Sequence, residues 1–183
     1  MFARTKRLTL RPGWPEDAAA VTRAIGHEHV VRMLAQAPWP YRLADAQRFL
    51  SRRRAPGEPF FLILAHEGDY PQPIGGIGLA PDEDGHELGY WLAPEAWGRG
   101  YATEAGQAVV SIARHALGLK RLHSGHFVDN PASGRVLEKL GFRATGAIKG
   151  RYSAGRGGIA PCRLFELDLA EEADACDTRA MAA

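Results

Sequence analysis

The chain is short of cysteine and of long apolar segments. Its two cysteines, Cys162 and Cys176, are too few for a disulfide framework and are typical of a reducing cytoplasm. No run of eighteen consecutive apolar residues occurs, so no membrane-spanning helix is expected. The first dozen residues lack the apolar core of a secretory signal. We therefore expect a cytoplasmic protein without a membrane partner.

The chain also lacks an excess of charge of one sign. Its 23 Lys and Arg residues nearly balance 21 Asp and Glu, and they are spread along the sequence, which argues against nucleic-acid binding. The one dense run, Arg52 to Arg54, has two interpretations: a solvated helix end that complements the helix dipole, or a contact with phosphate or an acidic partner. The seven histidines show no zinc-type spacing with cysteine, so we expect no metal site.

Hydrophobic periodicity and turn residues predict a single mixed α/β domain over residues 1–169, followed by a flexible tail over 170–183. Consecutive strands favour antiparallel pairing, and the later strand–helix–strand units favour a locally parallel pair, with helices on both faces of the sheet. Glycine-rich residues 150–161 are expected to be mobile. We predict strands at 7–11, 60–65, 74–79, 86–93, 121–128, 142–148 and 163–169, and helices at 15–26, 29–34, 43–54, 98–117 and 130–141.

The most informative segment is the junction at Gly98-Arg99-Gly100, where a strand leads through a glycine bend directly into a helix. Glycines let successive N–H groups converge, and the helix N-terminus adds the positive end of its dipole, so the junction is suited to a pyrophosphate. Arg99 would add a charge-assisted contact. The alternative is a tight turn with no ligand. The third glycine of a dinucleotide fingerprint and the Lys of a P-loop are both absent.

Two ordered motifs resemble those of the GNAT acetyltransferases, most closely the branch of ribosomal-protein N-acetyltransferases. The first runs from Glu87 through Gly98-Arg99-Gly100 to Ala105. The second is Asn130-Pro131-Ala132-Ser133, followed by Val136 and by Glu138 to Phe142. The superfamily pattern Q/R-x-x-G-x-G/A falls on Trp97 to Ala102 and departs from it at Trp97. The resemblance spans nearly the whole chain.

The resemblance implies a GNAT fold with a splayed pair of parallel strands, and acetyl-CoA as the cosubstrate. The pantetheine arm would lie in the gap between the two strands and the pyrophosphate at the glycine bend. The implied coenzyme-binding residues are Trp91, Leu92, Ala93, Trp97, Gly98, Arg99, Gly100, Tyr101, Ala102, Thr103, Asn130 and Ser133.

Acetyl transfer to an amine needs a base, because an alkyl ammonium has a pKa of roughly 10.4. We expect Glu87 to be this base, at a strand position where several GNAT members carry a glutamate. His86, His126 or a water chain are alternatives, and a structural ion pair is the other interpretation of Glu87. The Leu92 amide is the expected donor to the thioester carbonyl.

The departing thiolate needs a proton donor. Many family members use a tyrosine at the position of Leu137, so the resemblance points to Ser133 instead, with Tyr90 and Tyr101 as alternatives. Asn130 and Ser133 also fit simple helix-capping roles.

The resemblance implies transfer to a primary amine by direct attack in a ternary complex. The acceptor is a protein N-terminus or a small molecule, recognised by the loop with Trp39 and Tyr41 and by the hairpin with Arg151 and Arg156. The alternative function is a non-catalytic acyl-CoA-binding sensor or interaction module. A homodimer is a further option, since dimers are common in such folds.

Overall fold

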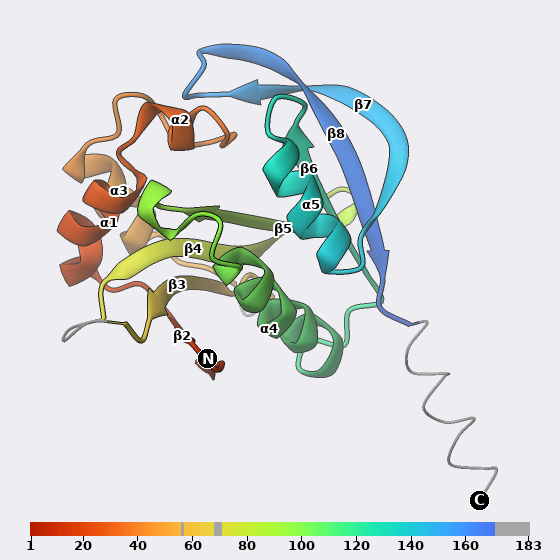
Figure 1. Ribbon diagram of the computed structural model, residues 1–183, viewed down its shortest axis with the longest axis horizontal. Coiled ribbons are helices and arrows are strands. Elements are labelled where there is room, and N and C mark those ends of the chain that lie inside the picture. The colour runs from red at the N-terminus through yellow and green to blue at the C-terminus, as the bar shows by residue number, and fades with distance from the viewer. Residues whose placement is uncertain (56, 68–70, 171–183) are drawn as a thin grey trace, which may run out of the picture.

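A computed structural model of the chain describes residues 1–55, 57–67 and 71–170 (Figure 1). Its strands are β1 (Ala3–Arg4), β2 (Leu8–Arg11), β3 (Phe60–Ala65), β4 (Pro73–Asp82), β5 (Gly85–Leu92), β6 (Arg121–Phe127), β7 (Arg143–Ser153) and β8 (Gly158–Asp168). Its α-helices are α1 (Ala18–Ile25), α2 (Glu28–Val31), α3 (Leu43–Ser51), α4 (Tyr101–His115) and α5 (Pro131–Lys139), with 3-10 turns at Pro15–Asp17 and Pro94–Ala96.

The strands form one sheet in the order β1-β2-β3-β4-β5-β6-β8-β7. Every neighbouring pair is antiparallel except β5 and β6, which run parallel because α4 crosses over between them. The predicted mixed, largely antiparallel sheet is confirmed.

Helices cover both faces of this sheet, as the alternation of β3 shows. Phe61 and Ile63 point into a core shared with α4, whereas Leu62 and Leu64 point into a second core built with α1 and α3. The two cores lie on opposite faces because successive strand side chains alternate. In Figure 1, α1 to α3 lie at one end of the sheet, and α4 and α5 lie beside the junction of β5 and β6.

The parallel strands β5 and β6 part immediately after they meet. Glu87 and His123 are their only registered pair among the described residues. One step further on, the Ser124 hydroxyl donates to the Leu88 carbonyl at 2.8 Å, so a side chain bridges the strands where a backbone hydrogen bond would continue the ladder. Beyond that point the strands diverge and leave a gap. The expected splayed pair is confirmed.

The prediction of a mobile segment over 150–161 was wrong. These residues extend β7 and β8 into a long hairpin, and β8 pairs with β6 from Cys162 to Asp168. The tip is anchored on the segment after α2, since the buried Ser153 hydroxyl donates to the Leu34 carbonyl at 2.7 Å and the Ala154 N–H donates to the Ala35 carbonyl at 2.9 Å. These tertiary contacts override the flexibility that glycine confers on an isolated chain.

The hairpin is also fastened by an ion pair between Arg156 and Asp129. The guanidinium donates to both carboxylate oxygens at 2.8 and 2.9 Å and stacks 4.7 Å from the Phe127 ring centroid. The hydrogen bonds from Arg156 hold the pKa of Asp129 below its usual value of 3.8.

We expect Asp129→Asn to lower the free energy of unfolding by up to about 1 kcal/mol at pH 7, because the pair is half-exposed and screened by water. A depressed folded-state pKa means that the stabilisation is complete at neutral pH and is lost as the pH falls below 3.8. Urea unfolding measures the difference in the free energy of unfolding between wild type and variant. This difference should be smaller near pH 3.5 than at pH 7. An equal difference at both values would contradict this role.

The helix predicted over 43–54 ends at Ser51, and the arginine run follows it, with Arg52 in extended backbone. The Arg54 guanidinium lies 4.7 Å from the ring centroids of both Phe49 and Phe60. Burial lowers the pKa of Arg54. The run is therefore not uniformly solvated, because its last member packs over two aromatic rings.

Of the tail expected over 170–183, only Ala170 belongs to the described residues, and Cys176 lies outside them. No described helix is both long and apolar enough to span a bilayer. Within the described ranges, His, Cys, Asp and Glu side chains form no group of three or more suited to a metal ion.

Candidate active site

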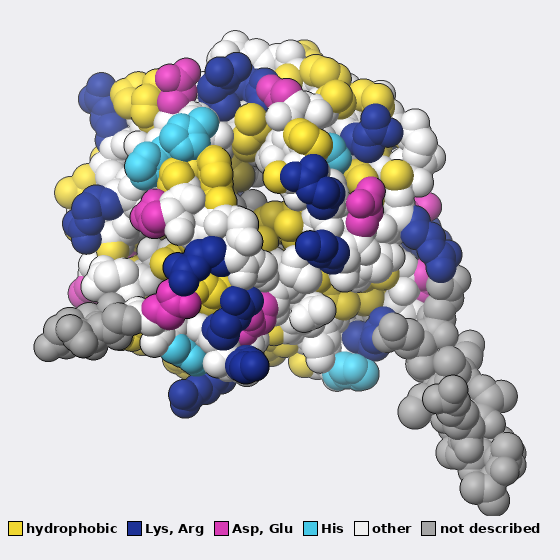
Figure 2. Space-filling view, viewed as in Figure 1, with side chains coloured by type: hydrophobic (Ala, Val, Ile, Leu, Met, Phe, Trp, Pro, Cys, Tyr) yellow, Lys and Arg dark blue, Asp and Glu magenta, His cyan; other side chains and the backbone are white. Residues whose placement is uncertain are grey.

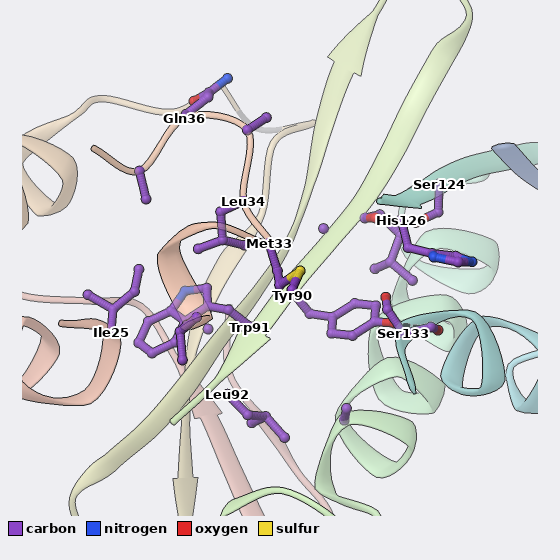
Figure 3. Close-up of a pocket in the computed structure, with 18 of the residues that line it drawn as sticks. Ile25, Met33, Leu34, Gln36, Tyr90, Trp91, Leu92, Ser124, His126 and Ser133 are labelled. Atoms are coloured by element: carbon purple, nitrogen blue, oxygen red, sulfur yellow. Dashed lines mark hydrogen bonds between the residues drawn. The ribbon is translucent and has the colours of Figure 1, made fainter. Parts of the chain in front are cut away.

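The gap between β5 and β6 opens into a cavity of about 1030 Å³ that continues beneath α1 to α3. Figure 2 shows the hollow in the middle of this face, with hydrophobic side chains inside it and Lys and Arg side chains around it. Strand β5 divides the cavity into two sides. In the close-up, Tyr90 points from β5 toward Ser133, whereas Trp91 points the opposite way, toward Ile25 and Leu34 (Figure 3).

Backbone alternation decides which groups of β5 face the gap. The Ala93 N–H donates to the Ile74 carbonyl at 2.8 Å, so Ala93 faces β4. Neighbouring residues of a strand direct their backbone groups to opposite edges, so Trp91 also faces β4, whereas Tyr90 and Leu92 face the gap. Of the three main-chain contacts expected at Trp91, Leu92 and Ala93, only Leu92 is therefore directed at the gap. Tyr90 is a second donor that sequence reasoning missed.

The glycine bend has the backbone of an anion site. Gly98 and Gly100 adopt left-handed φ values of +72° and +79°, which side-chain-bearing residues rarely adopt. The first intrahelical bond of α4 runs from the Glu104 N–H to the Gly100 carbonyl at 3.0 Å. The N–H groups of Tyr101, Ala102 and Thr103 precede it and point out of the helix end. The Trp97 amide is already used, since it donates to the Pro94 carbonyl at 3.1 Å.

Side chains from distant segments hold the bend in place. Arg7 donates to the Arg99 carbonyl at 3.0 Å and pairs with Glu104 at 2.7 Å. Glu67 accepts from both Arg99 and the Tyr101 hydroxyl at 2.5 Å. The hydrogen bond to Glu67 raises the pKa of Tyr101. The Tyr101 hydroxyl is therefore occupied outside the cavity, and Arg99 is paired with an acid.

On one side of β5, Tyr90 and Ser133 form a hydroxyl pair. Their oxygens lie 2.7 Å apart, and the Tyr90 hydroxyl also lies 3.0 Å from the Ser133 carbonyl (Figure 3). Burial raises the pKa of Tyr90 to about 12, so this phenol stays protonated at any working pH. Asn130 caps α5 by accepting from the Ser133 N–H at 3.3 Å, which fixes the serine at the cavity wall.

On the other side of β5, Glu87 forms a two-point ion pair with Arg151 of β7. One guanidinium nitrogen lies 2.7 Å from Glu87 Oε2, and the other contacts Oε1. The carboxylate raises the pKa of Arg151. Burial raises the pKa of the neighbouring Cys162 thiol, which disfavours its nucleophilic thiolate form. The sequence did not indicate this partner of Glu87, because only the order of the strands in the folded sheet brings Arg151 of β7 to the site.

The histidines are placed differently from one another. His86 lies opposite Glu87 in the alternation of β5 and does not line the cavity. His126 lines it, but its Nδ1 donates to the Phe127 carbonyl at 2.8 Å. Its Nε2 points at the bare backbone of Gly134 in α5, where an added Cβ would lie only 2.7 Å away. Trp39 is half-exposed and lies outside the cavity, whereas Tyr41 lines it.

Comparisons with known proteins agree with this geometry. Residues 7–143 match the acetyltransferase (GNAT) domain family. The chain is 26% identical over 167 residues to "Uncharacterized N-acetyltransferase p20" of Bacillus licheniformis, covering 89% of this chain and 93% of that protein. It is 42% identical over 84 residues to "Uncharacterized N-acetyltransferase YoaA" of Bacillus subtilis (strain 168), where the match spans 44% of this chain and about half of that protein, 48%.

Two solved structures share the fold. A GNAT-family acetyltransferase from Bacillus anthracis superposes with a TM-score of 0.79 at 22% identity, covering 93% of this chain and 99% of that one. RimL, a ribosomal L7/L12 alpha-N-protein acetyltransferase solved with coenzyme A, gives 0.75 at 16% identity, covering 92% and 98%. The family match, with the splayed strands and the glycine bend at the head of α4, identifies this chain as a member of the GNAT family of acetyl-CoA-dependent acetyltransferases.

Proposed function

We propose that the chain transfers the acetyl group of acetyl-CoA to a primary amine by direct attack in a ternary complex. The observation that carries this proposal is the position of the gap between β5 and β6. It joins the glycine bend, the hydroxyl pair and the Glu87 carboxylate in one cavity. The acceptor is the N-terminus of a peptide or a small-molecule amine.

The coenzyme would enter along this gap. N–H groups from Gly98 to Thr103 would hold the pyrophosphate, since left-handed glycines and a helix N-terminus together direct partial positive charge at an anion. The pantetheine arm would pair with the gap-facing backbone of Tyr90 and extend to Leu92, whose carbonyl accepts from the Trp97 indole N–H at 2.9 Å and whose N–H remains for the thioester. Asn130, whose carbonyl oxygen caps α5, retains an amide group to offer the arm.

In the chemical step the neutral amine attacks the thioester carbon. The Leu92 N–H donates to the carbonyl oxygen as negative charge develops there. Glu87 takes a proton from the attacking nitrogen, directly or through water. Arg151 holds this carboxylate in place, because its guanidinium contacts both carboxylate oxygens.

The C–S bond then breaks and leaves a thiolate near the hydroxyl pair. Alkyl thiols have a pKa of roughly 8.5, so a phenol whose pKa is about 12 cannot protonate the thiolate fully. We therefore propose that the pair stabilises the thiolate as a relay, in which one hydroxyl donates to its partner and the partner donates to the thiolate, until a proton from the attacking amine or from solvent neutralises it. This replaces the general acid expected at Ser133.

The function is tested by the release of free thiol from acetyl-CoA with a panel of primary amines and peptides. Turnover that requires both acetyl-CoA and an amine, and that yields the acetylated amine by mass spectrometry, is the expected result. Tight coenzyme binding without turnover on any acceptor would overturn the proposal and favour a binding module.

Removing either hydroxyl should slow turnover. We expect Tyr90→Phe and Ser133→Ala each to lower kcat by roughly tenfold, because a hydrogen bond to a charged group contributes about 1.5–3 kcal/mol. Since the pKa of Tyr90 is about 12, the pH–rate profile between pH 6 and 10 should keep its shape in Tyr90→Phe. An alkaline limb that disappears in this variant would instead show that Tyr90 titrates during turnover.

A further inference from the structure

On the side of the cavity that Trp91 faces, the sheet presents glycines, so part of its surface there carries no side chains. Strands β4 and β5 place Gly78 opposite Gly89, and Gly76 opposite Trp91. A Cβ added at Gly76 would lie 2.7 Å from both the Phe60 and the Trp91 rings, so these rings rest directly on the sheet. A Cβ added at Gly89 would meet nothing within 4 Å. The space above Gly89 is open.

Aromatic side chains lie on this side of the cavity. Phe49 and Phe60 pack edge to face with centroids 4.8 Å apart, and Tyr41 and Trp91 join them against the core of α1 to α3. We call the space between these four rings and the three glycines the aromatic slot. All seven residues line the main cavity.

The catalytic carboxylate lies at the inner end of the aromatic slot. Glu87, Gly89 and Trp91 are alternate residues of β5, so they share one face of the strand. A group lying over Gly89 is therefore between Trp91 and Glu87, each of which is one i to i+2 step, about 7 Å, from Gly89 along the strand. The substituent of an amine bound near Glu87 would occupy the slot.

The part of the cavity lined by the segment from α3 to β3, which we call the mouth, has an excess of positive charge. Three arginines, Arg48, Arg52 and Arg54, line it against two acids, Asp45 and Glu58. Arg48 lies 3.6 Å from Asp45, and Arg52 lies 3.9 Å from Glu58. Among the described residues, no carboxylate lies within 4.0 Å of Arg54, which donates only to backbone carbonyls. A second cation on the acceptor would meet this excess of positive charge.

We propose that the acceptor is a monoamine with an aromatic or bulky apolar substituent, which the aromatic slot binds while the amine lies at Glu87. The proposal rests on the proposed function and specifies its substrate class. Burial of an apolar group against four rings is favourable, and a bare glycine floor provides the room that such a group needs. Small polar amines leave the slot unfilled, and polyamines oppose the charge at the mouth.

Three acceptors test the proposal: phenylalaninamide, glycinamide and spermidine, each assayed with acetyl-CoA. The first two have the same amine and amide and differ only in the benzyl group. We expect kcat/KM for phenylalaninamide to exceed that for glycinamide by at least about tenfold, since even one methylene in a fitted pocket contributes about 10–200-fold. Spermidine should be the poorest of the three.

Gly89→Val fills the slot from its floor. Strand backbone suits valine, and the open space accommodates its side chain. We expect the kcat/KM ratio of phenylalaninamide to glycinamide to fall at least tenfold, with the acetyl-CoA-induced rise in melting temperature retained as proof of folding. Gly158→Val is the matched control, because Gly158 also lies in a strand, also has nothing within 4 Å of an added Cβ, and lies outside the cavity.

Equal kcat/KM for the two amides, preference for spermidine, or an unchanged ratio in Gly89→Val would overturn the assignment of the slot while leaving acetyl transfer intact. Absence of turnover with every primary amine would overturn the proposed function, and the inference with it.

Discussion

Replacing Gly100 with valine should lower the affinity for acetyl-CoA by at least about 30-fold. Gly100 is the N-cap of α4 at a φ of +79°, a conformation that a β-branched residue adopts only under strain. Relaxing that strain turns the N–H groups of the bend away from the pyrophosphate. Losing one hydrogen bond to a charged group costs about 2 kcal/mol, which corresponds to roughly 30-fold in Kd. Isothermal titration with acetyl-CoA measures the change.

Gly118→Val is the matched control for this experiment. Gly118 follows the C-terminal end of α4 at a φ of +64°, with nothing within 4 Å of an added Cβ. Both variants carry the same backbone strain, of about 1–2 kcal/mol, and should lose similar stability. Only Gly100→Val should lose coenzyme affinity. If acetyl-CoA binds both variants as it binds wild type, the bend does not hold the pyrophosphate.

The second large effect is expected for Glu87→Gln, which should lower kcat/KM for the amine by about 100-fold at neutral pH. A positioned general base contributes about 10²–10⁴-fold, and glutamine keeps the shape of the side chain without its basicity. Raising the pH should partly restore the rate of the variant, because a larger fraction of the amine is then already neutral. Steady-state thiol release between pH 7 and 10 measures both effects.

A structural ion pair is the alternative role of Glu87, and two controls separate the roles. Asp129→Asn makes the same acid-to-amide change in a second ion pair of this hairpin. Arg156 contacts both oxygens of Asp129, as Arg151 contacts both oxygens of Glu87. It should lower stability with little effect on kcat. Arg151→Lys keeps a cation beside Glu87. If all three variants lose activity only in proportion to their stability, Glu87 serves the fold and a water chain or His126 becomes the preferred proton acceptor.

The sequence alone indicated the local parts of the site. Glycines 98 and 100 before a helical stretch predicted the anion bend, and Asn130-Pro131 predicted the start of α5, because turn and capping preferences depend on neighbouring residues only. Alternation along β5 placed Glu87 and His86 on opposite sides for the same local reason. These features need no knowledge of the remaining chain.

The tertiary structure decided everything that depends on which segments meet. Arg151 reaches Glu87, and residues 150–161 form an ordered hairpin, only because β8 and β7 are added to the sheet beyond β6. The contact between Tyr90 and Ser133, 43 residues apart, and the stacking of Arg54 on two rings likewise require two elements to pack together. Local propensity carries no information on such long-range pairings, because packing and sheet order across the whole chain determine them.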